Sequence, residues 1–116
     1  MRLLIISLFL ALPTLMFPGV APAASFDCTK ARAADEVAVC RSRDLSEMDV
    51  RMATLFEVNT SLVLMGQRGA MQDEQRDWLK RRAGCGSNVA CLRTVYQVRI
   101  AELQRTFEEI RSSRPQ

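Results

Sequence analysis

The sequence contains no histidine, the side chain that proteins use most often as a general base and as a zinc ligand. Its serines and aspartates therefore lack a partner that a Ser-His-Asp triad needs. A zinc site would have to use all four cysteines, whose gaps of 12 and 6 residues are not the close Cys-x-x-Cys pairs of such sites. Neighbouring carboxylates such as Glu108 and Glu109 point to different faces of a helix, unlike a glycosidase pair. The sequence thus predicts no catalytic residue, no metal site and no cofactor, and we expect the protein not to be an enzyme.

Long apolar runs are absent except at the start of the chain. Residues 3–12 are apolar apart from one serine, three prolines follow, and Ala21-Pro22-Ala23 forms a small-x-small cleavage motif. This pattern predicts a signal peptide over residues 1–23, cut after Ala23 or Ala24, and favours it over an uncleaved membrane anchor. Lipid anchoring is not expected, because Cys28 does not directly follow the small residues of the cleavage site. We predict a periplasmic or secreted protein with no stable membrane anchor.

Neither sign of charge dominates. The chain has 16 Lys and Arg against 13 Asp and Glu, and loss of Arg2 with the signal peptide leaves 15 against 13. The one dense basic run, Lys80-Arg81-Arg82, has the length of a solvated helix face and is too short to indicate nucleic-acid binding. We therefore predict no nucleic-acid partner.

Four cysteines remain after the predicted cleavage: Cys28, Cys40, Cys85 and Cys91. An even number of cysteines in a short exported chain is typical of disulfides. The layout favours Cys28 with Cys40 and Cys85 with Cys91 over the two long-range pairings. The second pair spans a glycine-rich turn, and the first requires the segment before residue 33 to fold back along a short helix.

Apolar residues recur at helical spacing along most of the mature chain, and no stretch alternates in polarity long enough to indicate a strand. The spacing predicts a short helix over 33–40 and longer helices over about 45–65, 70–83 and 88–110. Residues 24–116 are thus predicted to form one all-α domain. It would be a small antiparallel bundle of three longer helices and one short N-terminal helix, with two disulfides.

Capping and breaking residues predict where these helices end. Asp44-Leu45-Ser46-Glu47 resembles a capping box and should start the long helix. Gly66 and Gly69 should flank the turn that follows. Residues 84–88, Gly-Cys-Gly-Ser-Asn, form the strongest breaker cluster, and Asn88 suits the N-cap of the last helix.

Several polar side chains fall on the apolar helix faces, namely Asp49, Gln75, Arg82 and Arg99. Because an unpaired buried charge is costly, we expect a semi-buried structural network in which Asp49 accepts hydrogen bonds from Arg82 or Arg99. The alternative is a ligand groove in which the two guanidinium groups bind carboxylates or phosphates. Trp78 and Tyr96 lie on the same stripes and are predicted to be core residues rather than a sugar-stacking platform.

The order and spacing of one set of residues resemble the LprI-like lysozyme-inhibitor N-terminal domain family. The set spans residues 26 to about 105: Phe26-Asp27-Cys28, Glu36, Cys40, Leu45, Asp49, Gln75, Trp78, Arg82, Cys85, Cys91, Tyr96, Arg99 and Leu103. The resemblance implies a small exported helical domain. The name-giving member inhibits lysozyme, and many other members have no known role. Phe56 departs from the tyrosine expected at its position.

The resemblance and the missing catalytic groups together predict a non-enzymatic binding protein of the periplasm or cell exterior. A lysozyme-type enzyme is the leading candidate partner, and a structural or envelope-stress protein is the alternative. Gly86, Ser87 and Asn88 are the candidate partner-binding residues, because a disulfide would hold their turn rigid.

Overall fold

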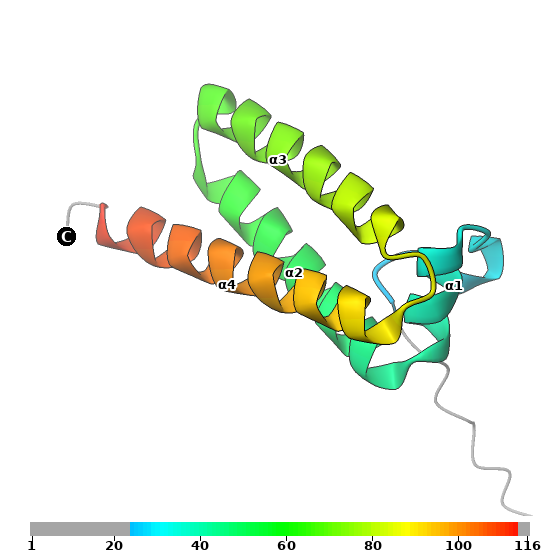
Figure 1. The fold of residues 1–116 in the computed structure, drawn as a ribbon. Helices are drawn as coiled ribbons and strands as arrows, with labels where there is room; N and C mark the ends of the chain where they lie inside the picture. Colours follow the sequence, from blue (N-terminus) through cyan, green and yellow to red (C-terminus); the bar gives the residue numbers. More distant parts are fainter. Residues whose placement is uncertain (1–23, 114–116) are drawn as a thin grey trace, which may run out of the picture.

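The computed structural model describes residues 24–113, which form one 3-10 turn and four α-helices (Figure 1). The signal peptide predicted over 1–23 lies outside these residues. The elements are the 3-10 turn Cys28–Lys30 and the helices α1 (Ala34–Arg41), α2 (Arg43–Leu62), α3 (Met65–Gly84) and α4 (Val89–Ser112). No strand occurs in this part of the chain. The predicted all-α class, with three longer helices and one short N-terminal helix, is confirmed.

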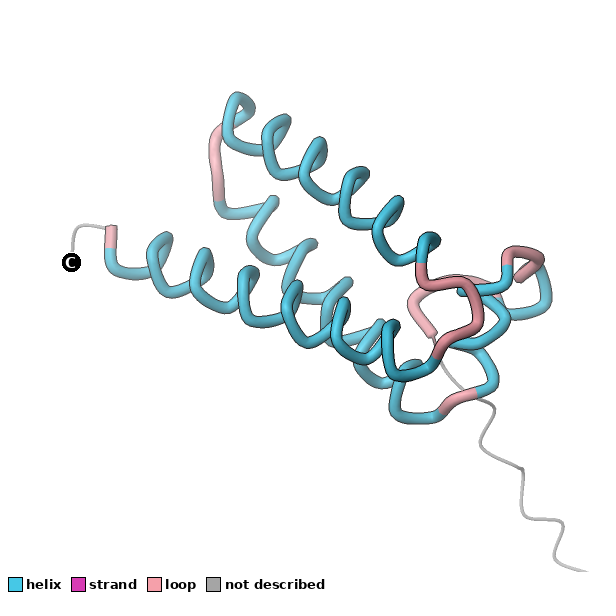
Figure 2. Tube along the Cα trace, in the orientation of Figure 1, coloured by secondary structure: helices cyan, strands magenta, loops and turns pink. Residues whose placement is uncertain are grey.

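Helices α2 and α4 lie side by side and run in the same direction (Figure 2). Helix α3 runs in the opposite direction and connects the end of α2 to the start of α4. The short helix α1 packs across the end of the bundle where α2 and α4 begin. The core lies mainly between these helices and comprises Val39, Leu45, Met52, Trp78, Cys85, Leu92, Tyr96, Ile100 and Leu103. Trp78 and Tyr96 are both buried, with ring centroids 5.2 Å apart in an edge-to-face arrangement. Neither ring is therefore available as a sugar-stacking platform.

The two disulfides join the cysteines that are neighbours in sequence. Cys28 is bonded to Cys40 and Cys85 to Cys91, with Cα atoms 5.8 and 5.6 Å apart. The first disulfide holds the N-terminal segment against α1, and the second closes the turn between α3 and α4. This is the pairing that the layout of the sequence favoured.

Helix α2 begins before the predicted capping box. Its N-cap is Ser42, whose hydroxyl oxygen accepts a hydrogen bond from the Leu45 amide at 3.5 Å. Asp44 lies instead in the first helical turn, where its negative charge suits the positive end of the helix dipole. Ser46 is buried and donates to the Val39 carbonyl at 2.7 Å. The predicted capping role of Asp44 was therefore wrong.

The predicted turn at residues 66–69 was also wrong, because α3 starts at Met65 and both glycines are helical. The chain reverses at residues 63–64 instead. Arg68 makes this possible: its Nε donates to the Thr60 carbonyl at 2.8 Å and its Nη2 to the Val63 carbonyl at 3.3 Å. These bonds satisfy carbonyl groups that the end of α2 leaves without helical partners.

Candidate functional site

The turn between α3 and α4 has a fixed shape. Gly86 has a φ of 54°, a left-handed conformation that side chains other than glycine rarely adopt. The Cys85–Cys91 disulfide closes the turn, and the Asn88 side chain accepts a hydrogen bond from the Cys91 amide at 3.0 Å. Of the three candidate partner-binding residues, Gly86 and Asn88 thus shape the turn, and Ser87 and Asn88 are both exposed on it. A partner could therefore contact Ser87 directly.

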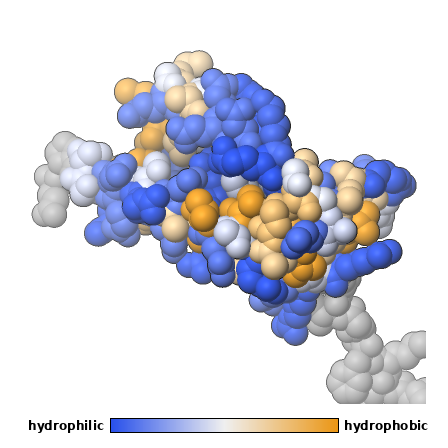
Figure 3. Space-filling model, in the orientation of Figure 1, coloured by the Kyte–Doolittle hydropathy of each residue, from blue (hydrophilic) through white to orange (hydrophobic). Residues whose placement is uncertain are grey.

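An open apolar groove of about 470 Å³ lies beside this turn. Its walls come from α1, the N-cap of α2, the turn and the first residue of α4. Its lining residues are Ala34, Val37, Ala38, Arg41, Ser42, Ser87 and Val89. Val89 is 40% exposed, a large value for an apolar side chain. Figure 3 shows apolar surface along the first half of α4 and at the end of the molecule that carries α1, while α3 is largely hydrophilic. Sequence reasoning found the turn but not the α1 wall of the groove.

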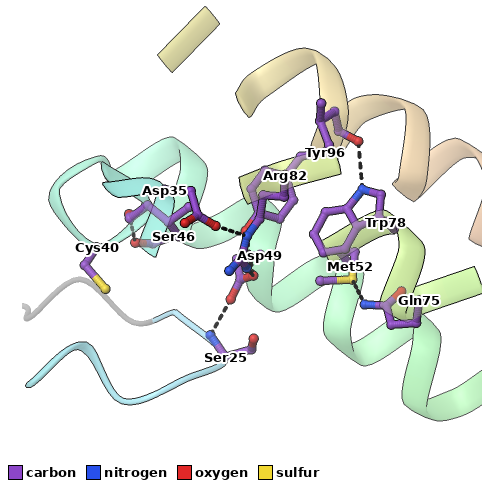
Figure 4. Close-up of polar contacts among 12 residues, drawn as sticks. Ser25, Asp35, Cys40, Ser46, Asp49, Met52, Gln75, Trp78, Arg82 and Tyr96 are labelled. Carbon is purple, nitrogen blue, oxygen red and sulfur yellow. Dashed lines mark hydrogen bonds and ion pairs between the residues drawn. The ribbon is translucent and has the colours of Figure 1, made fainter. Parts of the chain in front are cut away.

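A buried ion-pair network centres on Arg82 (Figure 4). The Arg82 Nε donates to Asp35 Oδ2 at 2.8 Å, and its Nη1 lies 3.7 Å from Asp49 Oδ1. The guanidinium also lies 5.5 Å from the centre of the Phe26 ring and 5.7 Å from that of Trp78. Four parts of the chain, the N-terminal segment, α1, α2 and α3, therefore meet at this one cation.

Tyr96 connects the network to α4. Its hydroxyl donates to Asp49 Oδ1 at 2.8 Å and accepts from Arg82 Nη1 at 3.3 Å. Burial and the adjacent Asp49 carboxylate raise the pKa of the Tyr96 phenol far above its ordinary value of 10.0. Burial opposes the charge of Arg82, but Tyr96 and Asp35 more than offset this and raise the Arg82 pKa. Tyr96 thus stays neutral, as donation to Asp49 requires, while Arg82 stays charged.

Arg99 and Gln75 belong to a second, separate cluster. The Arg99 Nε donates to Gln75 Oε1 at 3.1 Å, and its Nη1 donates to Glu102 at 3.2 Å. Asp49 is therefore paired with Arg82 and not with Arg99. The alternative groove with two guanidinium groups is wrong, because Arg82 is committed to buried carboxylates on α1 and α2.

Asp35 and Tyr96 are network members that sequence reasoning missed. Asp35 is buried four residues before Val39, and residues four apart share a helix face. That spacing was the available signal, but α1 is only 8 residues long and its periodicity is correspondingly weak. Tyr96 was assigned to the core for its ring, and the hydrogen-bonding need of its hydroxyl was overlooked.

The chain is similar to lipoprotein LprI of mycobacteria. The proteins of this name from Mycobacterium tuberculosis and Mycobacterium bovis are each 27% identical to it over 82 residues. The match covers 68% of this chain and 40% of each relative. The similarity supports a distant LprI-like relationship. The matched region thus spans less than half the length of these relatives.

No protein-family model and no solved structure matches the chain.

Within residues 24–113, no helix has the length and apolarity needed to cross a membrane. In the same residues, no three acidic or cysteine side chains form a group suited to a metal ion. All four cysteines are in disulfides, which is typical of an oxidising, extracytoplasmic compartment.

Tyr96 provides a direct test of the buried network, because it is the only tyrosine. We expect no phenolate absorbance near 295 nm as the pH passes about 10, the ordinary tyrosine pKa. Since the folded-state pKa is raised, the network stabilises the fold below the unfolded pKa of tyrosine and loses that contribution as the pH rises above it. Phenolate should therefore appear together with loss of helical circular dichroism. A phenolate signal near pH 10 in a protein that remains folded would contradict the buried arrangement.

Proposed function

We propose that the protein is an exported, non-catalytic binding protein whose contact surface is the 84–88 turn with the adjoining groove, and that it inhibits a lysozyme-type enzyme. The single observation that carries the proposal is the position of the exposed Ser87, at the tip of a disulfide-closed turn and on the wall of an apolar groove. The distant similarity to LprI supports a role in the cell envelope. The proposal that the enzyme is a lysozyme, and that it is inhibited, rests on the family resemblance of the sequence.

Rigidity is the physical reason to assign binding to this turn. Ordering a flexible loop on binding costs roughly 1–2 kcal/mol per residue in backbone entropy. The Cys85–Cys91 disulfide, the Asn88 cap and the left-handed Gly86 fix the loop before any partner arrives. A turn shaped in advance can enter a cleft without that cost.

The charge of the surface determines which contacts it favours. With 15 Lys and Arg against 13 Asp and Glu in residues 24–116, the domain gains no long-range attraction to a basic lysozyme. Complementarity must therefore be local. Arg41 lies on the groove beside apolar side chains, and a guanidinium suits the carboxylates that line a glycosidase cleft. We therefore expect the partner to present apolar surface next to carboxylates.

The test is lysis of a cell-wall substrate by several lysozyme types with micromolar mature protein. Ser87→Trp should reduce inhibition at least tenfold, equivalent to about 1.4 kcal/mol of binding, because a bulky side chain at the tip prevents entry. Ser61→Trp is the matched control, since it changes an exposed serine near the far end of α2. Both variants should melt within a few degrees of the parent, because exposed substitutions usually change stability little. Asn88 is unsuitable for this test because it caps α4.

Absence of inhibition at about 10 µM, where only complexes tighter than about −7 kcal/mol mostly form, would reject the inhibitor assignment. Equal inhibition by the Ser87→Trp and Ser61→Trp variants would reject the turn as the contact surface. The second candidate function is a structural or envelope-stress protein. It is favoured by the slightly basic net charge, which gives a binder of basic lysozymes no general advantage.

A further inference from the structure

The buried network around Arg82 contains more negative than positive charges. The Asp35 and Asp49 side chains are 5% and 1% exposed, and the Arg82 side chain between them is 8% exposed. Two buried carboxylates therefore share one buried cation among the described residues that form this network. An uncompensated buried charge is costly. A second positive charge close to Asp49 would balance the set.

The structure shows where such a charge would fit. Asp49 uses Oδ1 for Tyr96 and Arg82, while its Oδ2 accepts a hydrogen bond from the backbone nitrogen of Ser25 at 2.6 Å. In Figure 4 the N-terminal segment passes beside this oxygen. The segment is held there by packing of Ala24 and Phe26 against the core and by the Cys28–Cys40 disulfide.

We propose that Asp49 is the binding site for the chain's own α-ammonium group, which is created when the peptide bond before or after Ala24 is cut. The small-x-small motif Ala21-Pro22-Ala23 ends at this point. Hydrolysis of either bond adds one water, leaves a carboxylate on the released peptide, and leaves an amine on Ala24 or Ser25 that is protonated at neutral pH. A cut after Ala24 turns the Ser25 nitrogen that bonds Asp49 into the ammonium, whereas a cut before Ala24 places the ammonium one residue ahead of that nitrogen. In the uncut chain both nitrogens are neutral amides. Processing therefore supplies the fourth charge of the network.

The groups around this site favour a charged terminus. Asp49 on α2 attracts the ammonium directly, while Tyr96 on α4 is neutral and Arg82 on α3 repels it. The repulsion from Arg82 is offset by Asp35 on α1, which accepts its Nε at 2.8 Å. Asp27 also lies near in sequence but is exposed and bonded to Thr29. Asp49 is therefore the residue that should control the protonation of the terminus.

In the first experiment, the full chain is expressed in a bacterial host that exports it, and the mass of the mature protein is determined. The expected N-terminal residue is Ala24 or Ser25. A chain that remains uncut, or one that starts at Phe26 or later and so lacks the Ser25 nitrogen, would overturn the proposal. This result does not depend on whether a lysozyme is inhibited.

The second experiment titrates the α-amine of the exported protein by NMR. The amine should have a pKa about one unit or more above the ordinary 7.7–8.0 of a free terminus, as expected for a partner within a few ångström of an opposite charge. Asp49→Asn should return it to the ordinary range. The matched control Asp27→Asn should leave it almost unchanged. An ordinary pKa in the parent protein would overturn the proposal.

A third comparison covers the case in which Asp49→Asn does not fold. It compares the melting temperature of the mature chain with that of the same chain extended at its N-terminus by a short Gly-Ser segment. In the extended chain no ammonium lies at Asp49. Since the folded-state pKa is expected to be raised, the ammonium stabilises the fold below about pH 8, and this contribution is lost as the pH rises through the folded-state pKa. The mature form should therefore melt higher at neutral pH, and the difference should vanish in mild alkali. Equal melting of both forms at every pH would count against the proposal.

Discussion

Replacing Arg82 with methionine should lower the free energy of unfolding by about 3–5 kcal/mol, the usual loss when one partner is removed from a buried ion pair. Methionine preserves an unbranched apolar stem, so little of the effect would come from lost packing. The variant leaves Asp35 and Asp49 buried without their shared cation and removes a donor to the Tyr96 hydroxyl. Such a loss is comparable with the whole stability of a small domain. Urea unfolding followed by the fluorescence of Trp78, the only tryptophan, would measure it.

The matched control is Arg93→Met. Arg93 also pairs with an aspartate, Asp44, with its Nε donating at 3.0 Å, but these two side chains are 42% and 49% exposed. An exposed pair contributes about 0–1 kcal/mol. Adding Asp35→Asn to the Arg82→Met variant should recover part of the lost stability, because one uncompensated charge disappears. Similar small losses for Arg82→Met and Arg93→Met would contradict the buried network.

The network explains why this small domain keeps charged residues in its interior. A chain of about 90 residues buries only about 60–65% of its unfolded surface, so its apolar core is limited. Arg82 contacts the N-terminal segment, α1, α2 and α4 from a single position on α3. We infer that the network sets the position of α1, and with it the α1 wall of the groove.

The helices and disulfides were predictable because each depends on local signals. Apolar spacing located the ends of the long helices to within about three residues, except that α3 starts at Met65 rather than near residue 70. The glycines beside Cys85 made the short loop to Cys91 feasible. The predicted N-cap at Asn88 is confirmed. Such features depend on residues close in sequence, and a sequence displays them directly.

Two features were missed because they depend on side-chain contacts between different helices. Gly66 and Gly69 were predicted to break a helix, yet Arg68 caps the end of α2 from within α3, so the chain turns earlier. The partner of Arg82 could not be chosen from sequence alone. Asp35 lies 47 residues away, and only the packing of α1 against α3 brings the two together. Long-range pairing of this kind has no local signal.

The two disulfides should differ in what their loss does, although their contributions to stability are similar. Replacing Cys85 and Cys91 with alanine, or Cys28 and Cys40 with alanine, should each cost about 2–3 kcal/mol from loop entropy. Their sequence separations are 6 and 12 residues, and loop entropy grows only slowly with length. Chemical denaturation of the four proteins, with one disulfide, the other, both or neither, would measure these losses.

The two disulfide variants should differ in how strongly they inhibit the enzyme. Without Cys85–Cys91 the 84–88 turn must be ordered when the partner binds, at about 1–2 kcal/mol per residue newly fixed. Inhibition should therefore weaken at least tenfold, equivalent to about 1.4 kcal/mol or more of binding free energy. Without Cys28–Cys40 the N-terminal segment is loosened but the turn is not, so inhibition should be retained at temperatures where the variant stays folded. Equal loss of inhibition in both variants would show that the turn has no special role and that inhibition follows overall stability.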